Sequence, residues 1–231
     1  TAITIDASEN VGIGTASPDG KLEVEGSTAS TYIRVKGTVA DGYRHGYELQ
    51  NTHTGGRTWS MFTTNNSDGV FGGGKLVFSN VGADSATAAN SPLVINAAGI
   101  VTKPYQPSFS VRRNSNQTYN ANTDPVVALN DKHFDVGNNF NTSTYRFTAP
   151  VAGKYLFTAV IQFGANGTSH SCFYINGANS RDGWADFGAA SASTQTRILT
   201  LTSGDYVELR AYSDQTTSLS PRTRMTGFLI G

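Results

Sequence analysis

The side chains best suited to catalysis are few and scattered along this sequence. The histidines lie far apart, and none adjoins a nucleophile motif such as Gly-x-Ser-x-Gly. Asp182 and Asp186 stand four residues apart around Trp184, a pattern that could supply a carboxylate pair for cleaving a glycan. Solvated turn residues show the same pattern more often, because carboxylates are usually exposed. The sequence therefore predicts that the protein is not an enzyme.

Candidate metal ligands occur in one oxygen-rich turn. Residues 65–69, Asn-Asn-Ser-Asp-Gly, carry oxygen ligands beside a glycine. They lack the alternate ligand spacing and the closing glutamate of a calcium loop. We therefore predict no metal and no cofactor.

Two tryptophans and an arginine are the strongest single-residue candidates for recognition. Trp59, Trp184 and Arg181 are of the types that dominate binding hot spots. Large aromatic side chains also pack inside folds and subunit interfaces, which is the commoner use of tryptophan. Arg181 and Trp184 are predicted as a lateral recognition site, with packing as the alternative.

The composition excludes several partners. Lys and Arg number 17 and balance 17 Asp and Glu, so the sequence has no excess of basic residues of the kind that binds nucleic acid. No apolar run approaches the length of a membrane span, which predicts no membrane insertion. The chain begins at Thr1 without a signal peptide, and we expect it to be part of a longer protein.

The elements that must position these residues are β-strands. Residues 140–157 show a strand, a tight turn and a second strand: Phe147 alternates with polar neighbours, and Pro150 and Gly153 bracket the turn. Tyr155 and Phe157 then share one face of a long apolar strand. Because no helical periodicity longer than a turn or two occurs anywhere, the sequence predicts an all-β protein.

The spacing of Phe140, Phe147, Gly153, Tyr155 and Phe157 resembles the signature of the C1q-like domain, the trimeric jelly roll shared with the tumour necrosis factor superfamily. The resemblance covers roughly the last 125 residues. It implies a homotrimer in which Tyr155, Phe157 and Phe228 fill the sandwich core and the subunit interface. Within this region we predict strands at 108–112, 125–129, 134–136, 145–148, 153–163, 170–175, 183–187, 194–201, 205–212 and 225–230.

The resemblance also implies that the last strand ends at the base of the domain, beside the entering chain. Because antiparallel strands alternate in direction, counting backwards puts loops 164–168, 188–193 and 213–221 together at the opposite end, the apex. Loops carry recognition more often than strands do. We expect these three to contact a receptor, represented by Asn166, Ser191, Asp214, Gln215 and Ser218.

The chain before this region is built differently. Residues 10–24 resemble a motif frequent in phage tail-fibre shafts and in some bacterial surface proteins. Residues 5–11 are echoed by residues 95–101, which suggests one turn repeated on each side of a small β domain. That domain has predicted strands at 32–36, 43–51, 58–63, 75–79 and 93–95. We predict a β-rich shaft end at 1–26, a small β domain at 27–102 and a C1q-like head at 103–231.

These features together predict the distal part of a trimeric bacteriophage tail fibre or receptor-binding protein, located on the virion. Its partners would be itself and a bacterial surface receptor, glycan or protein, engaged through repeated weak contacts. A trimeric bacterial adhesin built from the same modules is the alternative. A glycan-cleaving spike is the third hypothesis.

Overall fold

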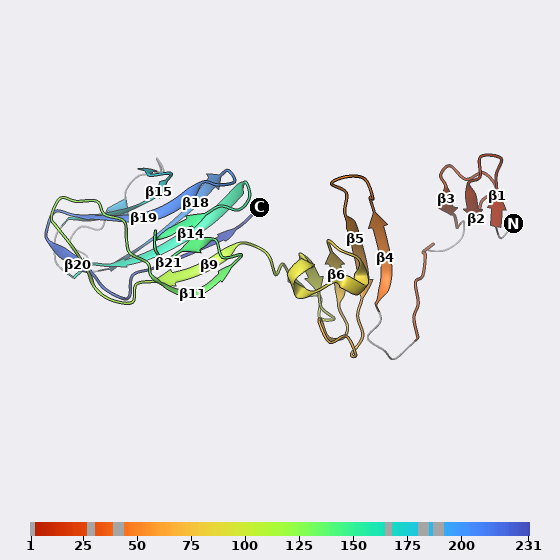
Figure 1. The fold of residues 1–231 in the computed structure, drawn as a ribbon, viewed down its shortest axis with the longest axis horizontal. Helices are drawn as coiled ribbons and strands as arrows, with labels where there is room; N and C mark the ends of the chain where they lie inside the picture. The colour runs from red at the N-terminus through yellow and green to blue at the C-terminus, as the bar shows by residue number, and fades with distance from the viewer. Residues whose placement is uncertain (1–2, 27–30, 39–43, 165–167, 180–184, 187–191) are drawn as a thin grey trace. The chain divides into compact units, whose positions relative to one another are not determined.

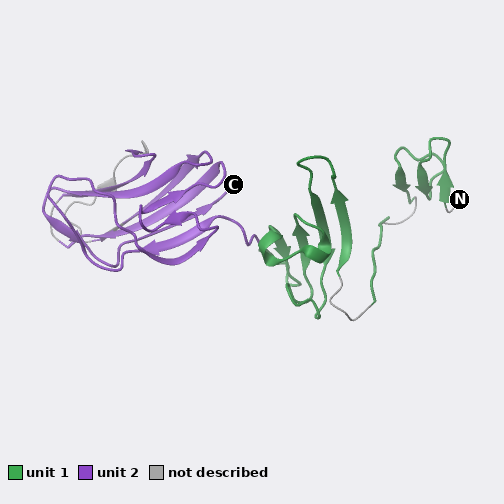
Figure 2. Ribbon diagram, viewed as in Figure 1, with its two compact units in different colours: residues 1–101 green, residues 102–231 purple. Residues whose placement is uncertain are grey.

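The structure, a computed structural model, describes residues 3–26, 31–38, 44–164, 168–179, 185–186 and 192–231. Strands and turns dominate these ranges (Figure 1), which confirms the predicted all-β class. The chain divides into two compact units, Thr1–Val101 and Thr102–Gly231 (Figure 2). The finer boundary expected at residue 26 stays a prediction. In the described ranges, no helix has the length and apolar character needed to cross a membrane.

The first sheet of unit 1 is small and has almost no core. Strands β1 (Ile3–Ile5) and β2 (Val11–Ile13) are antiparallel, and β3 (Leu22–Val24) joins β2 in parallel. The side chains of Ile3, Ile5 and Leu22 are mostly exposed. Strands of three residues cannot bury an apolar face against one another, so this sheet leaves its apolar side chains in water.

The predicted internal repeat is a repeated turn. The side-chain oxygen of Asp6 accepts the backbone N–H groups two and four residues later, at 2.8 and 2.9 Å. Asn96 does the same at 3.0 and 2.9 Å. The fourth residue of each turn, Glu9 or Gly99, has a positive φ of 61° or 79°. Asp and Asn suit this position because their short side chains can bond the backbone that follows.

The second sheet of unit 1 has one covered face. Its order is β4-β5-β6-β7-β8, with bounds β4 (His45–Gln50), β5 (Thr58–Thr63), β6 (Leu76–Ser79), β7 (Leu93–Ile95) and β8 (Val101–Thr102). Two 3-10 helices, η1 (Ala83–Ser85) and η2 (Ala88–Asn90), lie between β6 and β7. The buried apolar cluster is Phe62, Phe71, Val77, Ala86 and Val94.

Arg44 links the sheet to two segments outside its strands, the turn at Asp68 and the stretch of the 3-10 helices. Its guanidinium lies 5.0 Å from the ring centre of Phe62 and 5.1 Å from that of Phe71. It donates to Asp68 at 2.8 Å and to the carbonyl of Ala86 at 2.9 Å. Both partners of the ion pair are buried, and their hydrogen bonds offset the cost of removing two charges from water.

Unit 2 is a sandwich of two sheets. The first has the order β11-β9-β21-β14-β18 and the second β12-β13-β19-β15-β16, with β17 also paired to β15. The bounds are β9 (Ser108–Arg112), β11 (Asp131–Val136), β12 (Phe140–Asn141), β13 (Arg146–Thr148), β14 (Gly153–Gln162), β15 (Ser169–Ile175), β16 (Ala178–Asn179), β17 (Ala185–Asp186), β18 (Ala192–Leu201), β19 (Tyr206–Ser213) and β21 (Arg224–Leu229). A separate pair joins β10 (Gln117–Tyr119) to β20 (Thr217–Leu219).

The core of this sandwich is aromatic. Tyr155 and Phe157 on β14 are fully buried, as their alternation predicted. Phe109 stacks 4.9 Å from Phe147, and Phe157 packs edge-on at 5.7 Å from Phe147. Phe228, predicted with them for the core and the subunit interface, lies on the outer face of the first sheet with 45% of its surface exposed, so it is not in the core of the single chain and its place in an interface stays a prediction.

Two predicted strands are absent from the structure. Residues 32–36 are extended but pair with no strand in the described ranges. Residues 125–129 form only an isolated bridge from Val126 to Arg210, because Pro125 has no N–H to donate to a ladder. The strand expected from residue 145 begins at Arg146, since Tyr145 has a positive φ of 62° and belongs to the preceding turn.

Candidate functional site: the loop end of unit 2

The chain enters unit 2 and finishes at the same end of the sandwich. The backbone N–H of Leu229 donates to the carbonyl of Pro107 at 2.9 Å, and that of Lys154 donates to Gly231 at 2.7 Å. The side chain of Gln106 also donates to the carbonyl of Leu229, at 2.7 Å. We call this end the base.

Two of the three predicted contact loops meet at the opposite end. Gly164 donates its backbone N–H to the carbonyl of Ser218 at 2.8 Å, and Asp214 donates to the carbonyl of Thr168 at 3.1 Å. Loop 164–168 is therefore tied to segment 213–221 at both of its ends. Because Gly153 is at the base and Gln162 finishes the same strand, these loops lie at the far end, here called the loop end.

The third loop ends at the same place. Ala192 is the ladder partner of Gln162, so the strand that follows loop 188–193 starts at the loop end. Of the predicted contact residues, Gln215 is exposed, and Asp214 and Ser218 are half-buried. Asn166 and Ser191 lie outside the described residues, as do Arg181 and Trp184. Their receptor contacts stay predictions.

A fourth segment at the loop end was missed by counting strands. Strand β10 pairs with β20, and Asn122 donates its N–H to the carbonyl of Ser213 at 2.8 Å. Arg113, only 2% exposed, fixes the start of this segment through the carbonyls of Ser115 and Ala128 at 2.7 and 2.9 Å. Burial lowers the pKa of Arg113 from its ordinary value. The run of Asn, Ser and Thr at residues 114–123 was the available signal.

The interior of the sandwich becomes polar toward the loop end. Gln195 is 3% exposed and donates to Ser171 Oγ at 2.6 Å, while its Oε1 has no hydrogen-bond partner. The hydroxyls of Thr217 and Tyr119, ladder partners on β20 and β10, are also buried without a partner. Burial raises the pKa of Tyr119, so it stays a neutral phenol. A buried oxygen without a hydrogen-bond partner costs free energy of desolvation, so these groups stabilise the loop end less than apolar packing would.

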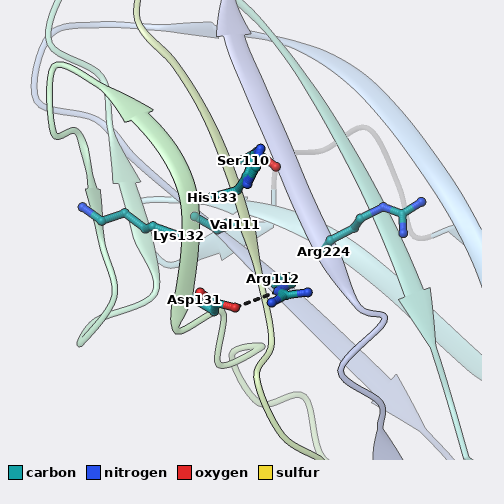
Figure 3. Close-up of a pocket in the computed structure, with 7 residues that line it drawn as sticks. All are labelled: Ser110, Val111, Arg112, Asp131, Lys132, His133 and Arg224. Carbon is teal, nitrogen blue, oxygen red and sulfur yellow. Dashed lines mark hydrogen bonds and ion pairs between the residues drawn. The ribbon is translucent and has the colours of Figure 1, made fainter.

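A shallow hollow on the outer face of the first sheet is lined by several positively charged side chains. Its volume is about 330 Å³, and it is lined by Ser110, Val111, Arg112, Asp131, Lys132, His133 and Arg224 (Figure 3). Arg112 pairs with Asp131 at 2.7 Å, and the side chain of Arg112 is 66% exposed and that of Asp131 36%. Arg224 is the ladder partner of Arg112, and Figure 3 shows its guanidinium turned away from that ion pair. The solvent-screened pair does not form a preorganised ion site.

The described side chains of the loop end include many hydroxyls and amides, which donate and accept hydrogen bonds with neutral sugars or with peptides. Within the described ranges, no three His, Cys, Asp or Glu side chains group closely enough to hold a metal ion. The arrangement suits contact through several weak hydrogen bonds.

Comparison with known proteins identifies the family. The model of the C1q domain matches residues 108–230, which is more than half of the chain. The chain belongs to the C1q domain family. The sequence resemblance to that domain and the predicted jelly-roll fold are thus confirmed. No curated protein matches the chain.

Three solved structures resemble the C1q domain of this chain. The globular domain of zebrafish complement 1qA is 24% identical, with 55% of this chain and 98% of that chain covered and a TM-score of 0.43. Murine APRIL is 12% identical, with 54% and 99% covered and a TM-score of 0.42. Eiger TNF from S. frugiperda is 12% identical, with 55% and 92% covered and a TM-score of 0.39.

Proposed function

We propose that this chain is a homotrimeric binding module, whose C1q domain meets its receptor with the loop end. The observation that carries the proposal is the separation of the two ends of the sandwich. The chain enters and finishes at the base, and loops rich in hydroxyl and amide groups gather at the other end. A domain tethered at its base presents the opposite end to a target.

The outer face of the first sheet supports a trimer. Leu156 lies between Ile198 and Phe228 in the ladder, and all three point away from the core. Ile198 and Phe228 are 57% and 45% exposed. A contiguous row of large apolar side chains on a sheet typically marks a protein interface. We assign this row to contact between copies of the chain.

The finer proposal is the distal part of a bacteriophage tail fibre, carried on the virion and attached to a bacterial surface receptor. Its support is the resemblance of residues 10–24 to tail-fibre shafts, together with a loop end rich in hydroxyl and amide groups that suits glycan or protein recognition. A trimer raises the effective concentration of each loop end, so that weak single contacts suffice.

Cell binding by loop variants tests this proposal. A fluorescent preparation of the full chain is screened on a bacterial panel, and strains that retain it are kept. A variant with Asn166, Ser191, Asp214, Gln215 and Ser218 all changed to Ala should lose binding while keeping its mass. Ser203→Ala, in the exposed turn at the base, serves as the matched control and should bind normally. Binding that survives the loop substitutions would show that the loop end is not the contact.

A further inference from the structure

The sheet β4–β8 in unit 1 has a second face that nothing in the described part of unit 1 covers fully. Leu49 is the ladder partner of Trp59, and Tyr47 is the partner of Met61, which neighbours Phe78 on β6. We call these five side chains the open face. Leu49 and Trp59 are 75% and 46% exposed. Together with Ser60, the five residues line a hollow of about 430 Å³.

Both faces of this sheet carry apolar side chains, and the charge of β4 does not lie on the open face. Glu48 lies between Tyr47 and Leu49 and so points to the other side of the sheet, where it is exposed to solvent. There its carboxylate accepts the N–H of Ala83 at 2.5 Å. None of the residues lining the hollow on the open face is charged. A half-buried sheet normally keeps its apolar face covered and its charged face in water.

The covered face alone is a small core. Within the described residues, the buried apolar cluster of unit 1 consists of Phe62, Phe71, Val77, Ala86 and Val94, and three of these are smaller than any side chain of the open face. A domain of this size buries little of its chain and is only marginally stable without further association. We therefore expect the partner that covers the open face to be bound whenever the unit is folded. Such a partner is a permanent subunit rather than a transient ligand.

A sugar does not suit this face. Ring stacking on Trp59 would need hydrogen-bond partners around it for the hydroxyl groups of the sugar. The open face offers one side-chain hydroxyl, that of Tyr47, and it already donates to the carbonyl of Ile33 at 3.2 Å. An apolar protein surface is the matching partner, as in the core of obligate subunit interfaces.

We propose that the open face, centred on Trp59, is a subunit interface of unit 1, covered in solution by a second copy of this chain. The inference rests on the proposed trimer and adds a contact that lies outside the C1q domain. It also assigns Trp59 to packing rather than to recognition of a receptor.

The fluorescence of Trp59 tests this assignment in the full chain. Trp59 and Trp184 are the two tryptophans, so Trp184→Phe leaves Trp59 as the sole indole. Acrylamide quenching and emission wavelength are recorded on the same fraction whose mass is determined by light scattering. We expect blue-shifted, quencher-resistant emission at three times 24.5 kDa, 73.5 kDa. If Trp184→Phe fails to fold, the emission of Trp59 is obtained by subtracting the spectrum and quenching of Trp59→Phe from those of the native protein.

Matched variants on β4 complete the test. Leu49→Glu inserts a charge into the open face and should remove the protection of Trp59, whereas Gln50→Glu, the next residue on the strand, should retain it. An oligomer with freely quenched Trp59, or one in which Leu49→Glu changes nothing, would overturn the interface while leaving the trimer intact. A particle of 24.5 kDa would overturn both.

Discussion

Phe157 and Phe228 lie on neighbouring strands of one sheet and face opposite sides of it. Phe157 is fully buried among aromatic rings, and we expect Phe157→Ala to lower the free energy of unfolding by about 3–5 kcal/mol, because it removes a large side chain and leaves a cavity. Chemical denaturation of the full chain measures this change. Phe228→Ala is the control, and it should leave the packing of the core intact.

The two substitutions should separate core from interface. If Phe228 contacts a neighbouring copy, its removal weakens association and lowers the mass at high dilution, whereas Phe157→Ala acts on unfolding first. An equal loss of unfolding free energy for both, with no change of mass, would place Phe228 in the core after all.

The sequence assigned Phe157 to a buried face for a physical reason. Strict alternation along β14 assigns Tyr155 and Phe157 to the buried face. On β21 the inward position beside Phe228 is Gly227, because a side chain there would meet the rings of Phe109 and Phe157, at 2.6 and 2.8 Å from its Cβ. Glycine carries no apolar signal, so the sequence alone did not show which of the two, core or interface, Phe228 belongs to.

At the scale of elements, strands of apolar residues were predictable and strands in polar runs were not. The expected bounds of β9, β5 and β7 match the structure, and those of β14 and β19 differ by a residue. Strands β10 and β20 were missed because each has three residues in a polar run, and only their mutual pairing makes them strands. Segment 125–129 was mistaken for a strand because its apolar side chains are buried without a ladder. The prediction of the loop end therefore omitted one of its four segments, the one that contains β10.

The ion pair of Arg44 and Asp68 makes unit 1 sensitive to acid. Burial raises the pKa of Asp68, but hydrogen bonds from Arg44 and from the backbone of Phe71 and Val70 outweigh it, so the pKa is lowered below 3.8. A lowered folded-state pKa contributes stability above the unfolded value and loses it as pH falls through the folded value. We therefore expect the melting temperature of unit 1 to fall from about pH 4 downward.

Asp68→Asn provides the comparison. This variant removes the titrating group, so its melting temperature should be lower than that of the native chain at pH 7 and should change less between pH 5 and pH 2. Thermal unfolding followed by the fluorescence of Trp59 reports on unit 1. Parallel curves for the two proteins across this range would show that Asp68 does not determine the acid response.

At the scale of the whole molecule, each part of the chain leaves apolar side chains in water. Ile3 and Ile5 in the first sheet, Leu49 in the second and Ile198 in the C1q domain are all more than half exposed. Such exposure in one part would be ordinary, but its recurrence in every part suits a chain that folds as one of several copies. The family resemblance in the sequence suggested an assembly of several copies, and the structure adds the apolar side chains that are exposed in one copy.

The solution mass of the full chain tests this account most directly. Light scattering should give 73.5 kDa, three times the 24.5 kDa of one chain, and the value should persist on dilution because the apolar faces are covered only in the assembly. A stable, folded particle of 24.5 kDa would contradict the homotrimer and the assignment of the exposed apolar faces to contacts between copies.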